Sequence, residues 1–355
     1  MQLRCINTIF RINIYGIIII LVAFWQSTPR MQILIPCLLM SKCNLIDYCN
    51  KFKCWDSDWP NLPLKDDEFN KWWKEWIKAS EDNQDWERLR RDLPQLYVIP
   101  NVGARLCTQY KQLVLQGANP TSSQIEGGVK KPLGFSIFLE SHWCGSIPVI
   151  RVKRKDEFDT LLQCFVHRCE PIEIQESVHS QAVSGLIHWG LIGTFGKSAR
   201  CKILILHDSP YSSVSYTAIP GISSEEEWIH CSHLWRLEHE LTHIACKFLV
   251  GEMRLNLYDE LLADAMGMRA SLGYFDAHLF ALTLGLNNDG TGRRGGRAYN
   301  YTKQLNAKEE IEVFKLVLER AYELDELLKK DICGIDDISL LRILTQNQLN
   351  KKIKV

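Results

Sequence analysis

The sequence predicts an α+β protein that is mainly helical, with a small sheet packed against the helix that carries a metal site. Three observations favour this class. Short strand-like runs lie in the middle of the chain, long runs with helical periodicity follow them, and one long helix contains two histidines four positions apart. The 355 residues, 46% hydrophobic and 24% charged, suffice for one large domain or two modest ones.

Charge and cysteine usage narrow the partners and the compartment. Lys plus Arg and Asp plus Glu each number 42, and no long basic run is present, so we expect no nucleic-acid partner. The 13 cysteines are odd in number, scattered and never spaced C-x-x-C. This usage favours reduced, buried thiols in a cytoplasmic protein over a secreted disulfide framework.

Residues 1–40 form an apolar N-terminal segment. Residues 12–25 are apolar except for Asn13, which is short for a membrane span and closer in length to the apolar part of a signal peptide. A second apolar run covers residues 31–40. Three interpretations stay open: a membrane anchor, a signal segment, or upstream sequence that is not normally translated, with the start at Met31 or Met40. Membrane contact through residues 12–25 is therefore the alternative to a cytoplasmic location.

Residues 41–130 form a Trp-rich region that we expect to be helical. Its aromatic residues recur at helical spacing and would serve either as a ligand platform or, as we prefer, as rings packed on the rest of the domain; they are Phe69, Trp72, Trp73 and Trp76. Residues 116–134 are dense in Gly, Pro, Ser and Asn. They predict a loop and the best candidate boundary, after which residues 131–330 form the metal-binding domain.

The elements of that domain follow in order. Residues 135–140, 147–154 and 202–208 predict strands, and residues 156–168 and 180–193 predict helices. A long helix should begin at Ser223 or Ser224 as the N-cap, run to about Val250 and end at Gly251. Its apolar stripe should face the core; it comprises Leu234, Leu237, Leu241, Ala245 and Phe248. Further helices should cover about 257–272 and 307–330, and residues 331–355 form a tail.

The long helix carries a pattern that is typical of metal sites. His239 and His243 lie four positions apart, so their imidazoles stack one turn apart, opposite the apolar stripe, and both can reach one ion. Glu240 is rotated to the flank of the pair, where it could touch a metal-bound water without being a ligand. The alternative is a solvated helix face with two histidines.

The following helix favours the metal interpretation. Glu260 and Asp264 project along the edge of its apolar stripe, where carboxylates are costly unless they are paired or bind a metal. The short segment before the helix can turn it back onto the histidines. We therefore expect Glu260 to be the third ligand, and Asp264 to accept a hydrogen bond from a ligand histidine. Ion pairs to Arg236 or Arg254 are the alternative.

His239, Glu240 and His243, followed 17 positions later by Glu260 and then by Asp264, resemble the gluzincin class of zinc metallopeptidases, of which thermolysin is a member. The similarity covers about residues 200–270. Residues 253–268 also resemble a stretch of uncharacterised bacterial proteins with the same histidine helix. The resemblance implies Zn²⁺ held by two histidines and a glutamate, with Glu240 as general base for cleavage of a peptide or amide bond.

The chain also departs from that class. Asp259 stands where an asparagine is frequent, and a strand that would align the substrate is hard to place, with residues 202–208 as the natural candidate. A developing oxyanion still needs a donor, and the glycines of the loop before residue 301 would allow that loop to approach the site, although we prefer to interpret the loop as an exposed turn. The candidates are Arg297, Tyr299 and Tyr301, with His278 and Tyr211 as outsiders.

Together these features predict a zinc-dependent hydrolase that acts on a peptide or protein substrate. One alternative is a non-catalytic protein in which zinc holds two helices together, and a fourth protein ligand would favour it. The other is a regulatory or interaction protein without a metal, whose Trp-rich helix is the working surface.

Overall fold

The computed structural model describes residues 9–14, 17–22, 45–50, 59–79, 84–293, 295–330 and 334–354. Residues 1–42 and 43–355 form two separate compact units. In the first unit, β1 (Ile9–Ile14) pairs antiparallel with β2 (Ile17–Val22). The rest of the apolar run 12–25, and the run 31–40, lie outside the described residues. Among the residues that are described, no helix has the length and apolar character needed to cross a membrane.

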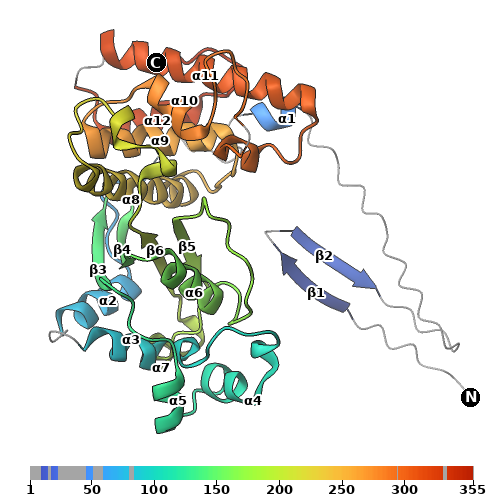
Figure 1. Ribbon diagram of the computed structural model, residues 1–355, viewed down its shortest axis with the longest axis vertical. Helices are drawn as coiled ribbons and strands as arrows, with labels where there is room; N and C mark the ends of the chain where they lie inside the picture. The colour runs from blue at the N-terminus through green and yellow to red at the C-terminus, as the bar shows by residue number, and fades with distance from the viewer. Residues whose placement is uncertain are drawn as a thin grey trace, which may run out of the picture. The chain divides into compact units, whose positions relative to one another are not determined.

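The second unit confirms the α+β prediction, because a small sheet lies among many helices (Figure 1). Its strands are β3 (Ser136–His142), β4 (Gly145–Val152), β5 (Ser180–Ser184) and β6 (Lys202–His207). Its helices are α1 (Leu45–Cys49), α2 (Glu68–Lys78), α3 (Asp85–Asp92), α4 (Thr108–Tyr110), α5 (Ser122–Gly127), α6 (Lys155–Phe165), α7 (Trp189–Phe195), α8 (Glu225–Leu249), α9 (Leu257–Leu272), α10 (Ala277–Leu284), α11 (Ala307–Lys330) and α12 (Asp337–Gln346).

The sheet has the order β3-β4-β6-β5. β3 and β4 form an antiparallel hairpin, β6 runs parallel to β4, and β5 runs antiparallel to β6 at the edge. β6 is therefore paired on both sides. The expectation that residues 202–208 align a substrate is wrong, because both backbone edges of that strand are already used within the sheet.

The two faces of the sheet are covered by different elements. One face packs with the Trp-rich helices: Trp73 and Trp76 share a core with Ile150 and Val152 of β4, which supports the packing interpretation of these rings. The other face packs against α8, where sheet residues meet two leucines of the helix; this contact comprises Ile147, Val149, Leu204, Leu206, Leu237 and Leu241. The predicted contact between the sheet and the histidine helix is therefore confirmed.

Helix α8 has the predicted ends. The Ser224 hydroxyl accepts a hydrogen bond from the backbone N–H of Glu227 at 3.2 Å, and Gly251, with φ of 78°, follows the last turn. The single apolar stripe is only partly correct. Phe248 is 48% exposed, and the side of the helix that carries His239 and His243 is buried too. Because α8 lies between the sheet and α9 (Figure 1), it is covered on two sides.

Helix α9 is buried along almost its whole length, from Leu257 to Met268. The Asn256 side chain caps its start by accepting hydrogen bonds from the N–H groups of Tyr258 and Asp259, at 3.1 and 3.0 Å. Gly267 permits close contact with α8, since a Cβ atom there would stand only 2.7 Å from the carbonyl oxygen of Trp235. On its other side, α9 packs in the core that it shares with α10, α11 and α12.

Two expectations about local structure are corrected. Residues 180–193 are not one helix: β5 occupies its first part, Gly185 has φ of 76°, and α7 begins only after His188 caps it. The apolar spacing could not separate a short edge strand from a helix. Residues 116–134 are not wholly loop either, because Thr121 and Gln124 form a capping box that starts α5. The tail contains α12, which packs on the core through Leu341 and Leu344.

Candidate metal centre

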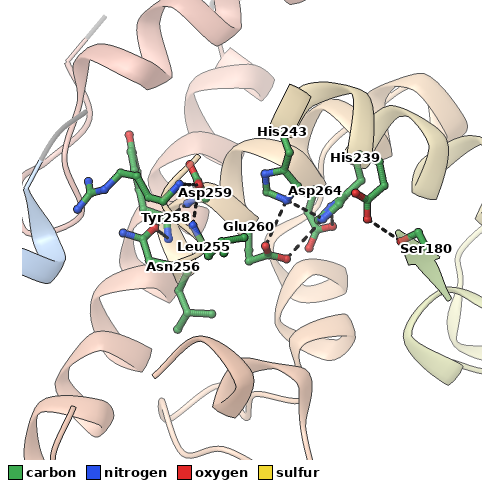
Figure 2. Close-up of polar contacts among 12 residues, drawn as sticks. Ser180, His239, His243, Leu255, Asn256, Tyr258, Asp259, Glu260 and Asp264 are labelled. Carbon is green, nitrogen blue, oxygen red and sulfur yellow. Dashed lines mark hydrogen bonds and ion pairs between the residues drawn. The ribbon is translucent and has the colours of Figure 1, made fainter. Parts of the chain in front are cut away.

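Three buried side chains from α8 and α9 converge (Figure 2). The Nε2 atoms of His239 and His243 are 3.1 Å apart. The carboxylate of Glu260 places Oε2 3.5 Å from Nε2 of His239 and Oε1 3.3 Å from Nε2 of His243. The structure therefore brings together the three ligands that the sequence predicts. Within the described part of the chain, this is the one group of His, Cys, Asp and Glu side chains that could hold a metal ion.

The segment between the two helices is fixed by a residue next to the ligand Glu260. One carboxylate oxygen of Asp259 accepts hydrogen bonds from the backbone N–H groups of Arg254 and Leu255, the latter at 3.0 Å. Leu255 has φ of 53°, a conformation that is rare for leucine and that these bonds stabilise. Asp259, which looked like a departure from the resembled class, thus holds the turn that brings α9 back onto α8.

The three donor groups fit Zn²⁺. Ligand atoms of a tetrahedral site with bonds of about 2.0–2.1 Å lie about 3.3–3.4 Å from one another, close to the separations of 3.1, 3.3 and 3.5 Å found here. Oε2 of Glu260 is buried and accepts no hydrogen bond from the described residues, and the guanidinium of Arg297 lies 3.8 Å from it. A buried carboxylate oxygen without a donor is costly, and a cation within this triangle would compensate it.

Asp264 orients the first histidine. Its Oδ1 lies 2.8 Å from Nδ1 of His239, so the proton of His239 resides on Nδ1 and its Nε2 presents a lone pair to the ion. The same carboxylate also accepts hydrogen bonds from Tyr211 Oη at 2.5 Å, from Trp235 Nε1 at 3.1 Å, and from Arg297. Asp264 is completely buried, and these four donors hold it in place.

Two titratable residues of the centre have pKa values that are shifted by their neighbours. Burial alone would raise the pKa of Asp264, but the charge of Arg297, the interaction with His239 and the hydrogen bond from Tyr211 hold that pKa well below its usual range. Burial alone would lower the pKa of His243, but its hydrogen bond and ion pair with Glu260 raise that pKa to about 9. An ion that binds His243 near neutral pH therefore displaces a proton.

Glu240 lies beside the three ligands without joining them. Its Oε1 accepts a hydrogen bond of 2.6 Å from the hydroxyl of Ser180 on β5 (Figure 2). Both residues line a cavity of about 600 Å³ that also reaches His239, His243 and Glu260. The geometry matches the flanking position that the helical spacing predicts for Glu240.

The predicted oxyanion donors have separate positions. Arg297 and Tyr301, in the 3-10 turn Arg297–Tyr301, line the cavity. Arg297 is engaged with Asp264 and donates to Tyr211 Oη at 2.8 Å. Tyr299 is not among the described residues that line the cavity: its hydroxyl donates to the Gly292 carbonyl at 3.3 Å, and its ring packs on Phe314. Tyr299 is therefore a poor candidate for the oxyanion donor, because its position in the 3-10 turn directs its ring into the core and away from the cavity.

His278 is an exposed partner of Tyr322, at 3.2 Å. Tyr211, the other outsider, lies within the site, with its hydroxyl 3.1 Å from Nδ1 of His239. The two arginines proposed as alternative ion-pair partners are used elsewhere. Arg236 donates to backbone carbonyls such as that of His207, and Arg254 donates to the carbonyl of Tyr48.

Two contributors to the site are not predicted from the sequence. The apolar spacing predicts a helix at Ser180, which lies on β5, and no pattern singles out Trp235, which donates to Asp264. Neither position carries a local signal, because each contact joins residues at least 29 positions apart. The described cysteines do fit the expected reduced state, since Cys144, Cys164, Cys169, Cys201 and Cys246 are buried free thiols.

The chain matches a known family model. The model of a family described as a family of unknown function, DUF7005, matches residues 43–200 and 196–351. No curated protein matches the chain, and neither does any solved structure. The resemblance to gluzincins therefore stays a prediction that rests on the residues quoted above.

Proposed function

The chain belongs to that family of unknown function, and we propose from the site itself that it is a zinc-dependent hydrolase that cleaves a peptide or amide bond. The observation that carries the proposal is a centre with three protein donors, in the wall of an open cavity, beside an acid that is not a donor. Structural zinc sites are closed by four protein ligands, whereas catalytic sites keep a position for water.

The residues can be given roles. When bound, Zn²⁺ lowers the pKa of a water molecule towards about 7 and polarises a carbonyl oxygen. His239, His243 and Glu260 would hold the ion. Glu240, oriented by Ser180, accepts a proton from the attacking water and passes it to the leaving amine. Tyr301 is the better candidate for the oxyanion donor. Its hydroxyl bonds to Glu260, a partner that a bound ion would take over, whereas Arg297 is engaged with Asp264.

The cavity wall supports a peptide substrate. β5 is an edge strand of the described sheet, and residues 177–184 line the cavity. An extended peptide can add to such an edge through its backbone hydrogen bonds, and these do not depend on sequence. Because Ser180 is part of this strand, a peptide paired with β5 would lie directly beside Glu240.

The proposal is tested by elemental analysis of the purified chain, followed by a cleavage screen with a peptide library, with and without a chelator. We expect about one zinc per chain, and cleavage that the chelator abolishes and added zinc restores. Glu240→Gln should keep the zinc and reduce cleavage by about 100-fold or more. A chain without metal, or equal cleavage by Glu240→Gln, would refute the hydrolase assignment.

A further inference from the structure

Two lysines lie at one end of the cavity. Lys202 is the first residue of β6, and Lys247 lies on α8 four positions after the ligand His243. Both line the cavity. Four positions correspond to one turn, or about 6 Å along the helix, so Lys247 is the next residue on the face that carries the two histidines.

Neither lysine forms an ion pair within the described part of the chain. The other cationic residues of the cavity do have partners: Arg236 donates to backbone carbonyls and to Ser209, and Arg297 pairs with Asp264 and Glu260. The charge of Asp67, whose side chain caps the start of α2, acts on Lys202 from beyond ion-pair distance. Nζ of Lys202 instead lies 3.8 Å from the ring centroid of the exposed Phe248.

The two positive charges act on each other. Burial lowers the pKa of Lys202, the charge of Asp67 opposes this shift, and the neighbouring charge of Lys247 adds to it. The acids that line the cavity, Glu240 and Glu260, belong to the metal centre. The cavity therefore has a metal-binding end and a cationic end, and no described carboxylate forms a direct ion pair with a lysine of the cationic end.

Strand β5 gives the distance between the two ends. Ser180 bonds to Glu240, and Ser184 is the register partner of Lys202. The four intervening steps span about 14 Å of extended chain. Lys247 lies only about 6 Å along α8 from His243, so the two lysines bracket a position about two to four residues along a peptide from the reacting bond.

We propose that the cavity selects peptides with a carboxylate two to four residues from the cleaved bond, and that Lys202 and Lys247 bind this carboxylate. The inference rests on the proposed function. An aspartate or glutamate side chain and a C-terminal carboxylate share this chemistry. Phe248 packs under Lys202 and would hold its ammonium group over the cavity.

The test is a binding selection with zinc-loaded full-length Glu240→Gln. The probe is a library of random acetylated octapeptides, prepared once with a free C-terminal carboxylate and once as the amide, and the bound peptides are sequenced by mass spectrometry. We expect enrichment on the order of tenfold for carboxylate-bearing peptides. Enrichment of Asp and Glu in the amide library identifies a side-chain carboxylate. Preference for the free over the amidated library identifies the C-terminus.

Variants in the same background separate this site from general charge effects. Lys202→Ala with Lys247→Ala should remove the preference while the zinc content stays near one per chain. Lys202→Glu with Lys247→Glu should select Lys- and Arg-bearing peptides instead. Lys308→Ala, at an exposed lysine of α11, is the matched control and should keep the original preference.

The inference is overturned if no carboxylate preference is found, or if it persists in the double alanine variant. The cleavage screen with the unsubstituted chain reports on the hydrolase separately. Carboxylate-dependent binding without any cleavage would refute the hydrolase and leave the binding site in place. Cleavage without a carboxylate preference would refute the carboxylate-binding site and leave the hydrolase in place.

Discussion

The two sides of α8 differ in kind. Towards the sheet, Leu237 and Leu241 pack against apolar strand residues. Towards α9, His239 and His243 meet the buried carboxylates of Glu260 and Asp264. Burial of the leucines is favourable in itself, whereas burial of a carboxylate is costly unless a positive charge or hydrogen-bond donors compensate it. The side of α8 that faces the sheet therefore stabilises the fold, whereas the buried charges on the side that faces α9 are best explained by a cation site.

The largest expected effect is on the α9 side. His239→Ala should reduce the zinc content from near one per chain to near zero, because two remaining ligands hold the ion poorly and structural zinc sites contribute about 10–16 kcal/mol of binding free energy. Elemental analysis after gel filtration measures it. His278→Ala, at the exposed histidine that contacts Tyr322, is the control and should keep its zinc. Zinc retained at wild-type affinity in His239→Ala would remove this residue from the ligand set.

The sheet side should respond in the opposite way. Leu241→Ala deletes a buried side chain and should lower the free energy of unfolding by about 2–5 kcal/mol, while the folded protein still binds one zinc. Urea unfolding followed by tryptophan fluorescence measures the stability, and elemental analysis the zinc. If Leu241→Ala lost its zinc while remaining folded, the two sides would not be separable as described.

A smaller effect is expected at the orienting carboxylate. Asp264→Asn should weaken zinc binding by about 10- to 100-fold, because the hydrogen bond that fixes the His239 tautomer is weakened. Competition with a chelating dye measures the affinity. Tyr211→Phe removes only one of the donors to Asp264 and should cost less than Asp264→Asn. Equal affinity of Asp264→Asn and the unsubstituted chain would show that the carboxylate does not tune the site.

The smallest effect should fall on Ser180. Ser180→Ala removes one hydrogen bond to Glu240, so we expect cleavage to slow by about fivefold with the zinc content unchanged. Ser123→Ala, at an exposed serine of α5 that does not line the cavity, is the matched control. A loss as large as that of Glu240→Gln would mean that Ser180 does more than orient the base.

Much of this comparison was predictable from the sequence, because local rules dominate in helices. The caps at Ser224 and Asn256, together with Gly251 and Gly273, mark the ends of α8 and α9. Once the two helices are placed, helical periodicity puts His239 and His243 on one face of α8 and Glu260 in the first turn of α9. The contacts that join distant segments were not predictable in this way. Ser180 reaches Glu240 only because β5 pairs with β6, and a five-residue edge strand carries no pattern that excludes a helix.

The glycine-rich loop shows the same limit. Its glycines allow a close approach to the site but favour an exposed turn, whereas the structure places Arg297 and Tyr301 at the cavity. Which of its side chains turn inwards depends on a single 3-10 turn, whose phase the sequence does not specify. The sequence suggests Arg297 as a donor to the substrate's oxyanion. In the structure it pairs with Asp264 instead, because a buried carboxylate attracts a nearby cation more strongly than a neutral substrate does.

The contact between Gly267 and Trp235 has a consequence for the choice of ion. At this contact α8 and α9 pack through the backbone of Gly267 and the backbone and indole ring of Trp235, and the bulk of the indole limits how closely the two helices approach. An ion of another radius must then be accommodated by rotation of the ligand side chains, since the helices cannot close further. Trp235, which is not a ligand, would thus influence which divalent cations the site accepts by size.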